Sequence, residues 1–304
     1  MSVTRLVYEV SSTGNHYIDL AKDLSIINRK LIRQKQIFTV MGGIMHDSQG
    51  AQMEFMVAPH TWTTKLAINR AFKQWRKLQS QTYKRNDGLR APKWNDFKVY
   101  LDVTHNATRT LTPIYSSGRA HATGEWNYST LTQPKLIDAN NDGELGFDAN
   151  ADQWDLQIVG EHTVDGTNTV TTAGGQTLIP NYTRVGMIKS WYDSRAVPDT
   201  AVPDNTPDTR MDPLSNLFDI EDDDGEHAAI IESENDQAPY DYNRVQGAGD
   251  SETQVVSIAD NSVGEPDVTT VPGFSAICGL IKINVVSENT FKLILDVQTE
   301  GERF

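Results

Sequence analysis

Short stretches rich in β-branched and aromatic residues recur along most of this chain, and they limit the folds that it can adopt. We expect strands at residues 4–12, 36–46, 51–58, 94–104, 124–131, 153–160, 166–172, 184–193, 274–287 and 290–298. Clusters of glycine, asparagine, aspartate and threonine separate many of them, as turns require. Many short strands joined by turns are typical of a β-sandwich or barrel, and not of alternating β-α-β units. The sequence therefore predicts a mainly β protein.

One long amphipathic helix interrupts this pattern at residues 62–85. When the helix is projected at 100° per residue, its apolar side chains fall within about 120° of one another. They are Ile68, Ala71, Phe72, Trp75 and Leu78. We expect Phe72 and Trp75 to anchor the helix to a sheet. Residues 17–35 leave two interpretations open, because leucine and isoleucine at helical spacing favour a helix, whereas the central Ser-Ile-Ile-Asn favours a strand or a turn.

Charge is divided unevenly along the chain, whose net charge is −14. Residues 1–110 contain 17 basic and 8 acidic residues, a net charge of +9, and the remainder carries −23. This asymmetry suggests two surfaces that meet different environments; the alternative is that long acidic loops simply lie in the second half. Residues 195–250 contain five prolines and the acidic run Asp219–Glu226. We expect this long polar excursion to lie on the outer surface.

Several classes of function lack their sequence signatures. The single cysteine, Cys278, excludes an intrachain disulfide and an all-cysteine metal cluster. No apolar run approaches the ~18 residues of a membrane span, and the opening MSVTRLVYEV has no apolar region, so we also expect no secretory signal. The chain contains no HxH, HExxH, GxSxG or GK[ST] pattern. We therefore expect a protein that is not an enzyme.

The opposite face of the 62–85 helix is basic and is the most informative candidate site. The stretch from Lys65 to Lys98 holds ten basic and two acidic residues. Four of them cluster away from the apolar stripe: Arg70, Lys73, Lys77 and Lys84. Because lysine and arginine neutralise phosphates without any exact spacing, nucleic acid is one partner for this face. An acidic surface of a neighbouring subunit is a second partner, and solvent alone is a third interpretation.

A possible calcium loop lies further along the chain. Asp138, Asn140, Asp142 and the following Gly143 resemble the first half of an EF-hand loop, in which oxygen ligands alternate and a glycine allows a sharp turn. The twelfth position is Ala149 and not a carboxylate, and Asp148 lies one residue early. The candidate Ca²⁺ ligands are therefore Asp138, Asn140, Asp142 and Asp148, and the alternative is a turn between strands.

Four stretches together resemble capsid proteins of small circular single-stranded DNA viruses, of the environmental and marine type. They are YIDLAKDLSIINRKLIRQ (17–34), PHTWTTKLAINRAFKQW (59–75), WNDFKVYLD (94–102) and PGFSAICGLIKI (272–283). The resemblance implies a jelly-roll β-sandwich of about eight strands, with one or two amphipathic helices and long loops. It also implies that many copies close into an icosahedral shell around the genome. Many such capsids begin with an arginine-rich arm, whereas this chain has only Arg5 in its first twenty residues.

These observations lead to one expected function and two alternatives. We expect a single jelly-roll domain over residues 1–304 that self-assembles as a capsid subunit inside the host cell and becomes part of the virion. Its partners would be further copies of itself and packaged nucleic acid, bound without sequence specificity, and no membrane. The first alternative is a calcium-dependent β-sandwich module for carbohydrate binding or attachment. The second is a glycoside-cleaving enzyme.

Overall fold

The described part of the chain is mainly β, and its strands pair chiefly in the antiparallel sense, as the strand pattern predicts. The computed structural model describes residues 2–46, 52–85, 92–108, 110–137, 146–172, 175–194, 239, 245–249, 253–260, 268–286, 290–298 and 304. Residues 138–145 and nearly all of 195–250, which carry the candidate calcium loop and the acidic excursion, lie outside these ranges.

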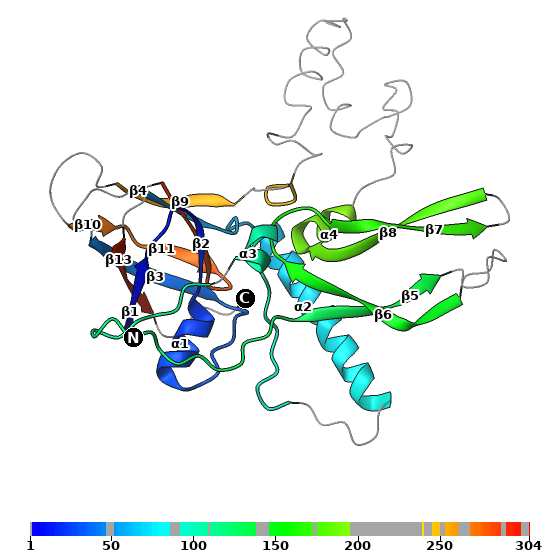
Figure 1. Ribbon diagram of the computed structural model, residues 1–304, viewed down its shortest axis with the longest axis horizontal. Helices are drawn as coiled ribbons and strands as arrows, with labels where there is room; N and C mark the ends of the chain where they lie inside the picture. Colours follow the sequence, from blue (N-terminus) through cyan, green and yellow to red (C-terminus); the bar gives the residue numbers. More distant parts are fainter. Residues whose placement is uncertain are drawn as a thin grey trace, which may run out of the picture.

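Two sheets face each other at one end of the molecule (Figure 1). The first has the order β1 (Val3–Val10), β13 (Phe291–Gln298), β3 (Ile37–His46) and β10 (Val268–Val271), and β11 (Phe274–Ile277) also pairs with β3. The second has the order β2 (Gly14–Asp19), β12 (Leu280–Val285), β4 (Gln52–Val57) and β9 (Gln254–Asp260). All their strand pairs are antiparallel.

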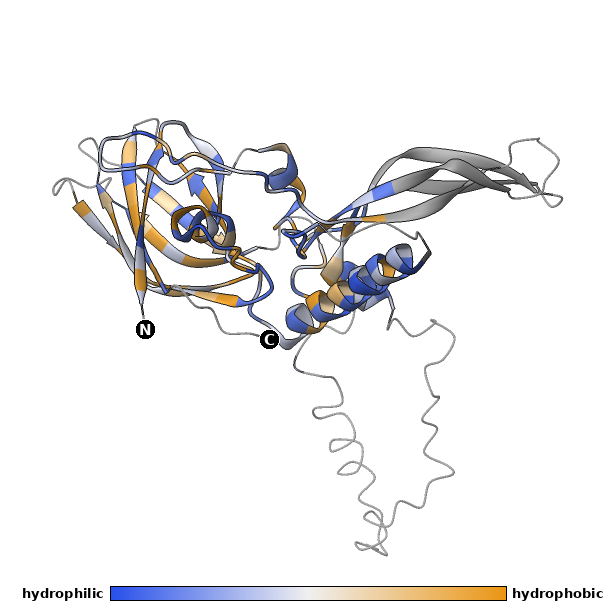
Figure 2. Cartoon of the chain, turned by 90° about the horizontal axis from the view of Figure 1, so that it is seen from below, coloured by the Kyte–Doolittle hydropathy of each residue, from blue (hydrophilic) through white to orange (hydrophobic). Residues whose placement is uncertain are grey.

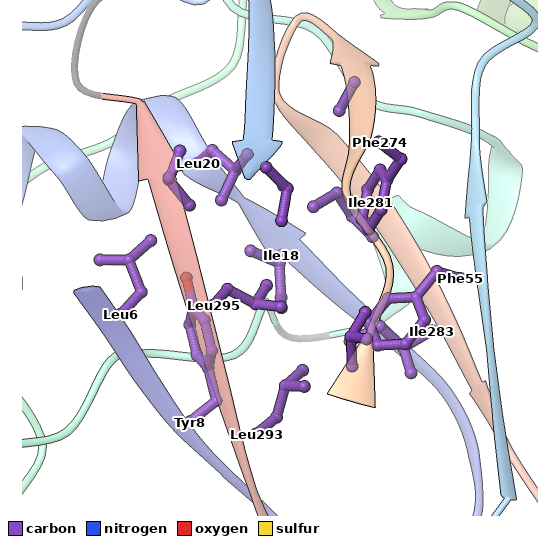
Figure 3. Packing of buried hydrophobic residues seen from close by; sticks show 14 of the residues in the cluster. Leu6, Tyr8, Ile18, Leu20, Phe55, Phe274, Ile281, Ile283, Leu293 and Leu295 are labelled. Carbon is purple, nitrogen blue, oxygen red and sulfur yellow. The ribbon is translucent and has the colours of Figure 1, made fainter. Parts of the chain in front are cut away.

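The main core lies between these two sheets (Figure 3). Leu6, Tyr8 and Val10 of β1 alternate with more exposed residues, as a strand with one buried face requires. They meet buried side chains of the second sheet such as Phe55 and Ile283. In Figure 2 hydrophobic residues recur along these strands in the same way. Period-two patterning therefore builds the sandwich.

A short helix, α1 (Leu20–Asn28), follows β2 and resolves the ambiguous segment 17–35. The side chain of Asp19 caps it by accepting the Lys22 backbone N–H at 3.1 Å. The helix ends at Arg29, whose φ of 50° is left-handed. The central Ser-Ile-Ile-Asn belongs to this helix, so the helical interpretation is right for the centre of the segment, and only residues 17–19 are a strand, as the end of β2.

The long helix α2 (Trp62–Arg85) has the predicted bounds. Ile68, Ala71 and Trp75 are buried in a second hydrophobic cluster, together with Phe97 and Ile188. The ring of Trp75 contacts Phe97, and their cluster is separate from the main core but includes strand residues such as Leu156 of the segment 146–157. The helix keeps its basic face turned away from that cluster.

A third sheet lies beyond α2 and α4 (Figure 1). Its order is β5 (Thr130–Ile137), β6 (Gly146–Gln157), β8 (Gly175–Gly186) and β7 (Thr163–Thr172), with β6 and β8 parallel. This sheet, α2, α3 (Val103–Ala107) and α4 (Met187–Asp193) all fall between β4 and β9 in the sequence. One long insertion between two sandwich strands therefore supplies them.

Four predicted strands are wrong in part. Of the predicted strand 124–131, only residues 130 and 131 belong to β5, and residues 124–129 form no regular structure. Of the predicted strand 94–104, residues 94–102 contain only an isolated bridge, at Tyr100. Residues 103 and 104 belong to α3, whose N-cap Asp102 accepts the His105 N–H at 2.9 Å. Residues 187–193 of the predicted strand 184–193 are α4, which begins after Gly186. The predicted strand 274–287 is broken at Cys278 and Gly279, whose φ angles are 58° and 67°. The described part of the chain holds four helices, and not one or two.

Residues 245–249 correct the expected course of the acidic excursion. Ala248 is buried in the second cluster, and the carbonyl of Gly247 accepts the Gly160 N–H at 2.9 Å. The end of the segment 195–250 is therefore packed against the insertion and does not form an outer surface loop.

Candidate nucleic-acid interface

The basic face of α2 carries the four residues that the sequence singled out. At helical spacing Arg70, Lys73, Lys77 and Lys84 share one side of the helix, opposite the buried stripe. Lys73, Lys77 and Lys84 are exposed, whereas Arg70 is half-buried and donates a hydrogen bond to the Ser194 hydroxyl. Arg70 thus joins α2 to the end of α4, and the three lysines present the accessible charge.

No carboxylate within α2 balances this charge. The helix contains seven basic residues and neither aspartate nor glutamate, so intrahelical pairs at i and i+4 cannot neutralise it. Like charges that crowd one face repel one another, and an external anion relieves that repulsion. This unbalanced charge suits either of the two partners that the sequence left open, phosphates or the carboxylates of a neighbour.

The candidate calcium ligands cannot be assembled from the described residues. Asp138, Asn140 and Asp142 fall in 138–145, outside those residues, and Asp148 lies within β6 with no described side chain. Within the described ranges, no group of three or more histidine, cysteine, aspartate or glutamate side chains could hold a metal ion.

A buried carboxylate, Asp19, gathers donors from distant segments. It accepts hydrogen bonds from Gln34 Nε2 at 3.1 Å, Trp126 Nε1 at 3.0 Å and Tyr128 OH at 3.4 Å. Burial raises its pKa to about 6, although these donors and Lys22 act in the opposite direction. The network fixes the loop around Trp126 against the start of α1.

A second buried network joins the insertion to the sandwich. Asp102 accepts from Lys282 Nζ at 2.9 Å and from Tyr17 OH at 2.7 Å. Burial acts to raise the Asp102 pKa, but the bonds from Lys282 and Tyr17 hold it below its ordinary value. Both oxygens of Asp102 are engaged by the protein itself, so this carboxylate joins segments together and is not free to accept a proton from a substrate.

His105 lies beside this network and is held neutral. Its ring stacks on Tyr17 with centroids 4.4 Å apart, and its Nδ1 accepts the Leu101 N–H at 3.0 Å. Burial lowers the His105 pKa to about 4. Cys278 is likewise buried, and burial raises the pKa of its thiol.

The residues that sequence reasoning missed form a second basic group near the end of α1. Lys22, Arg29 and Lys30 line one pocket together with Lys98, Trp94 and Trp126. These side chains come from α1 and from loops that follow it by about seventy residues or more. No spacing within one segment could therefore predict that they lie together. The high basic content around Lys93 and Lys98 was the available signal.

Comparisons of the chain with protein-family models, with curated proteins and with solved structures found no match. Among the described helices, none combines the length and the apolar character that crossing a bilayer requires.

Proposed function

We propose that this chain is a viral capsid subunit, which self-assembles into an icosahedral shell that encloses the genome. The observation that carries the proposal is the strand order of the two facing sheets. Within the described ranges the sandwich has eight strand positions in chain order: β1, β2, β3, β4, β9, β10 with β11, β12 and β13.

The pairing of these positions is nested. The first position pairs with the eighth, the second with the seventh, the third with the sixth and the fourth with the fifth. The third position also pairs with the eighth, and the fourth with the seventh. This order supports a jelly roll, in which a long antiparallel ribbon is folded over on itself. Viral capsid domains and lectins are built on this architecture.

Exposed apolar side chains support self-assembly. Val255 and Ile258 are about half exposed on β9, which lies at the edge of the second sheet, and Trp62 and Leu66 are exposed on α2. An edge strand with exposed apolar side chains favours pairing with another chain. In a shell these surfaces would be buried between subunits.

The distribution of charge supports a shell that encloses nucleic acid, which is a polyanion. The unbalanced lysines of α2 offer a positive surface, whereas the chain as a whole is acidic. In a symmetric shell, the basic and the acidic surfaces of each subunit can face different environments, with phosphates against the basic face. Binding of this kind is sensitive to salt and insensitive to base sequence.

A carbohydrate-binding or attachment module is the second candidate, because lectins share the architecture. A cavity of about 490 Å³ favours it, lined by Tyr100, Tyr128 and threonines such as Thr108 and Thr110. Hydroxyls beside aromatic rings suit a sugar, which presents both hydroxyl groups and apolar faces.

Electron microscopy of the purified chain separates the two candidates. We expect closed particles of uniform diameter. Dispersed single subunits that bind a glycan, and that lose this binding in Tyr100→Ala, would reject the capsid function in favour of the module. A matched control is Tyr115→Ala, because Tyr115 is exposed and does not line the cavity.

A further inference from the structure

A pocket of about 300 Å³ lies between the C-terminal part of α1 and two loops of the insertion. Lys22, Arg29 and Lys30 come from α1 and its cap, Trp94 and Lys98 from residues 92–99, and Trp126 from the loop before β5. Four basic side chains thus line a pocket in which Glu125 is the acidic lining residue. The pocket is distinct from the basic face of α2.

The two indoles of the pocket differ in exposure and in their hydrogen bonds. Trp126 is half-buried and is held by its bond to Asp19, and Lys98 Nζ lies 4.6 Å from the centre of its ring. Trp94 is 58% exposed, and Lys93 Nζ lies 5.0 Å from its ring centre. One aromatic wall is therefore fixed in place, and a second offers an accessible flat surface within a positive field.

Arg29 has a backbone conformation that usually favours glycine. Its φ of 50° at the C-cap of α1 is the conformation in which helices commonly end with glycine. An arginine there bears a steric cost that glycine avoids. Arg29 and Lys30 are both exposed at this end of the pocket. The strained cap places a guanidinium group at the rim of the pocket.

Positive charge and accessible aromatic surface together select the ligand chemistry. Phosphates bind lysine and arginine, and unpaired bases stack on indole rings, whereas a duplex keeps its base faces stacked inside. The pocket is at the small end of the usual range for ligand sites, so it suits one or two bases and not a duplex.

We propose that this pocket binds a segment of single-stranded nucleic acid, with a base stacked on Trp94 and the neighbouring phosphates held by Arg29, Lys30 and Lys22. The inference rests on the proposed function, since it specifies how a shell subunit would hold the strand that it encloses. It assigns this contact to the α1 pocket and not to α2 alone.

The test measures binding of a fluorescently labelled twelve-nucleotide oligothymidylate to the 304-residue protein at several salt concentrations. Trp94→Ala removes the exposed indole and should weaken binding about five-fold or more. Arg29→Gly gives the cap its preferred residue, so its melting temperature should not fall, yet it should weaken binding and reduce the salt dependence by about one phosphate contact. Lys292→Gln removes one exposed charge on β13, away from the pocket, and should leave binding nearly unchanged.

Three outcomes would overturn the inference. The first is undiminished binding in both Trp94→Ala and Arg29→Gly, which would assign the contact to another surface. The second is equal affinity for thymidine monophosphate, which would indicate a nucleotide site and not a strand site. The third is tighter binding of a heparin oligosaccharide with the same dependence on Trp94 and Arg29, which would indicate a sulfated glycan.

Particle formation by the same variants separates this inference from the proposed function. Trp94→Ala particles of normal size that bind the oligonucleotide weakly would support both. Normal particles with unchanged binding would reject the pocket and leave the capsid function standing. A wild-type protein that forms no particles would reject the capsid function, whatever the binding result.

Discussion

At the scale of single residues, buried side chains join segments that are far apart in the sequence. Lys282 and Asp102 form an ion pair across 180 positions, and Trp126 reaches back to Asp19. An aspartate before an apolar helical stretch is a common N-cap, but the ambiguous pattern of residues 17–35 did not predict this role for Asp19. The sequence also does not show the long-range partners, since nothing local marks which distant donor will fill a buried oxygen.

Trp75 is the residue on which α2 depends most. It is 7% exposed, and its ring centre lies 5.7 Å from that of Phe97. Trp75→Ala should lower the free energy of unfolding by about 3–5 kcal/mol, because it removes a large side chain from a packed cluster. Urea unfolding of the variant measures this change.

Trp62→Ala is the matched control on the same helix. Trp62 is 64% exposed and makes an edge contact with Trp191, so its loss should cost at most about 1.5 kcal/mol. Equal effects of the two substitutions would show that α2 is not docked through Trp75.

Asp19 should make the free energy of unfolding fall as pH rises, which is opposite to the usual effect of a carboxylate. Burial raises its pKa from 3.8 to about 6, so the folded protein holds this proton more tightly than the unfolded chain does. The Asp19 contribution to the free energy of unfolding therefore falls as pH rises between these values, by about 3 kcal/mol in total. Asp19→Asn should abolish this contribution.

The measurement compares the free energies of unfolding at pH 4 and pH 7 in both proteins. His105 titrates in the opposite sense, because burial lowers its pKa from 6.5 to about 4 and its contribution is lost as pH falls. It is present in both proteins and cancels in the comparison. Identical pH profiles for the wild type and Asp19→Asn would contradict the prediction.

At the scale of elements, the hydrophobic pattern correctly predicted the segments in which buried residues recur at a regular spacing. The helix 62–85 has its predicted bounds because one apolar stripe persists through several turns. Residues 94–104 and 187–193 were wrongly predicted as strands, because their apolar residues are buried by the insertion while Asp102 and Gly186 start helices. A short apolar run does not by itself distinguish a strand from a short helix or a buried loop.

The turn between β11 and β12 joins the two sheets of the sandwich through only two residues. It carries the chain from the first sheet to the second through Cys278 and Gly279. A Cβ atom on Gly279 would lie 2.8 Å from the Phe38 ring, and its φ is +67°. Gly279→Ala should therefore destabilise the protein by about 2–5 kcal/mol, which combines left-handed strain with overpacking.

Gly118→Ala isolates the backbone part of this cost. Gly118 has a φ of +79° and open space around its Cβ position, so its substitution should cost only about 1–2 kcal/mol. Equal costs for the two variants in urea unfolding would show that Phe38 does not restrict the turn.

The three exposed lysines of α2 should control either packaging or assembly. Replacing Lys73, Lys77 and Lys84 by glutamine removes the accessible charge and leaves the Arg70 bond to Ser194 in place. We expect particles of normal size that contain less nucleic acid, measured by the ratio of absorbance at 260 and 280 nm. Lys292→Gln with Arg119→Gln is the control for charge loss elsewhere.

Two other results assign the lysines differently. Failed assembly of the triple variant would place these lysines at a contact with carboxylates of a neighbouring subunit. Normal particles with unchanged nucleic-acid content would reject both roles and leave a solvated helix face.

At the scale of the whole molecule, the strand order and the insertion matter most. The sequence predicted short strands and a mainly β fold. It did not predict the nested strand pairing, because pairing between positions hundreds of residues apart leaves no local pattern, and the expectation of a jelly roll came only from the resemblance. The insertion between β4 and β9 also escaped prediction, because its strands resemble those of the sandwich. Its third sheet has its own pairing and shares no ladder with the other two.

The mass of the purified protein in solution tests the central claim most directly. Sedimentation across a range of salt concentrations and pH values should reveal large particles of one size, in which many copies of the 33.9 kDa chain are combined. A species of 33.9 kDa alone under every condition would contradict the account of this chain as a capsid subunit.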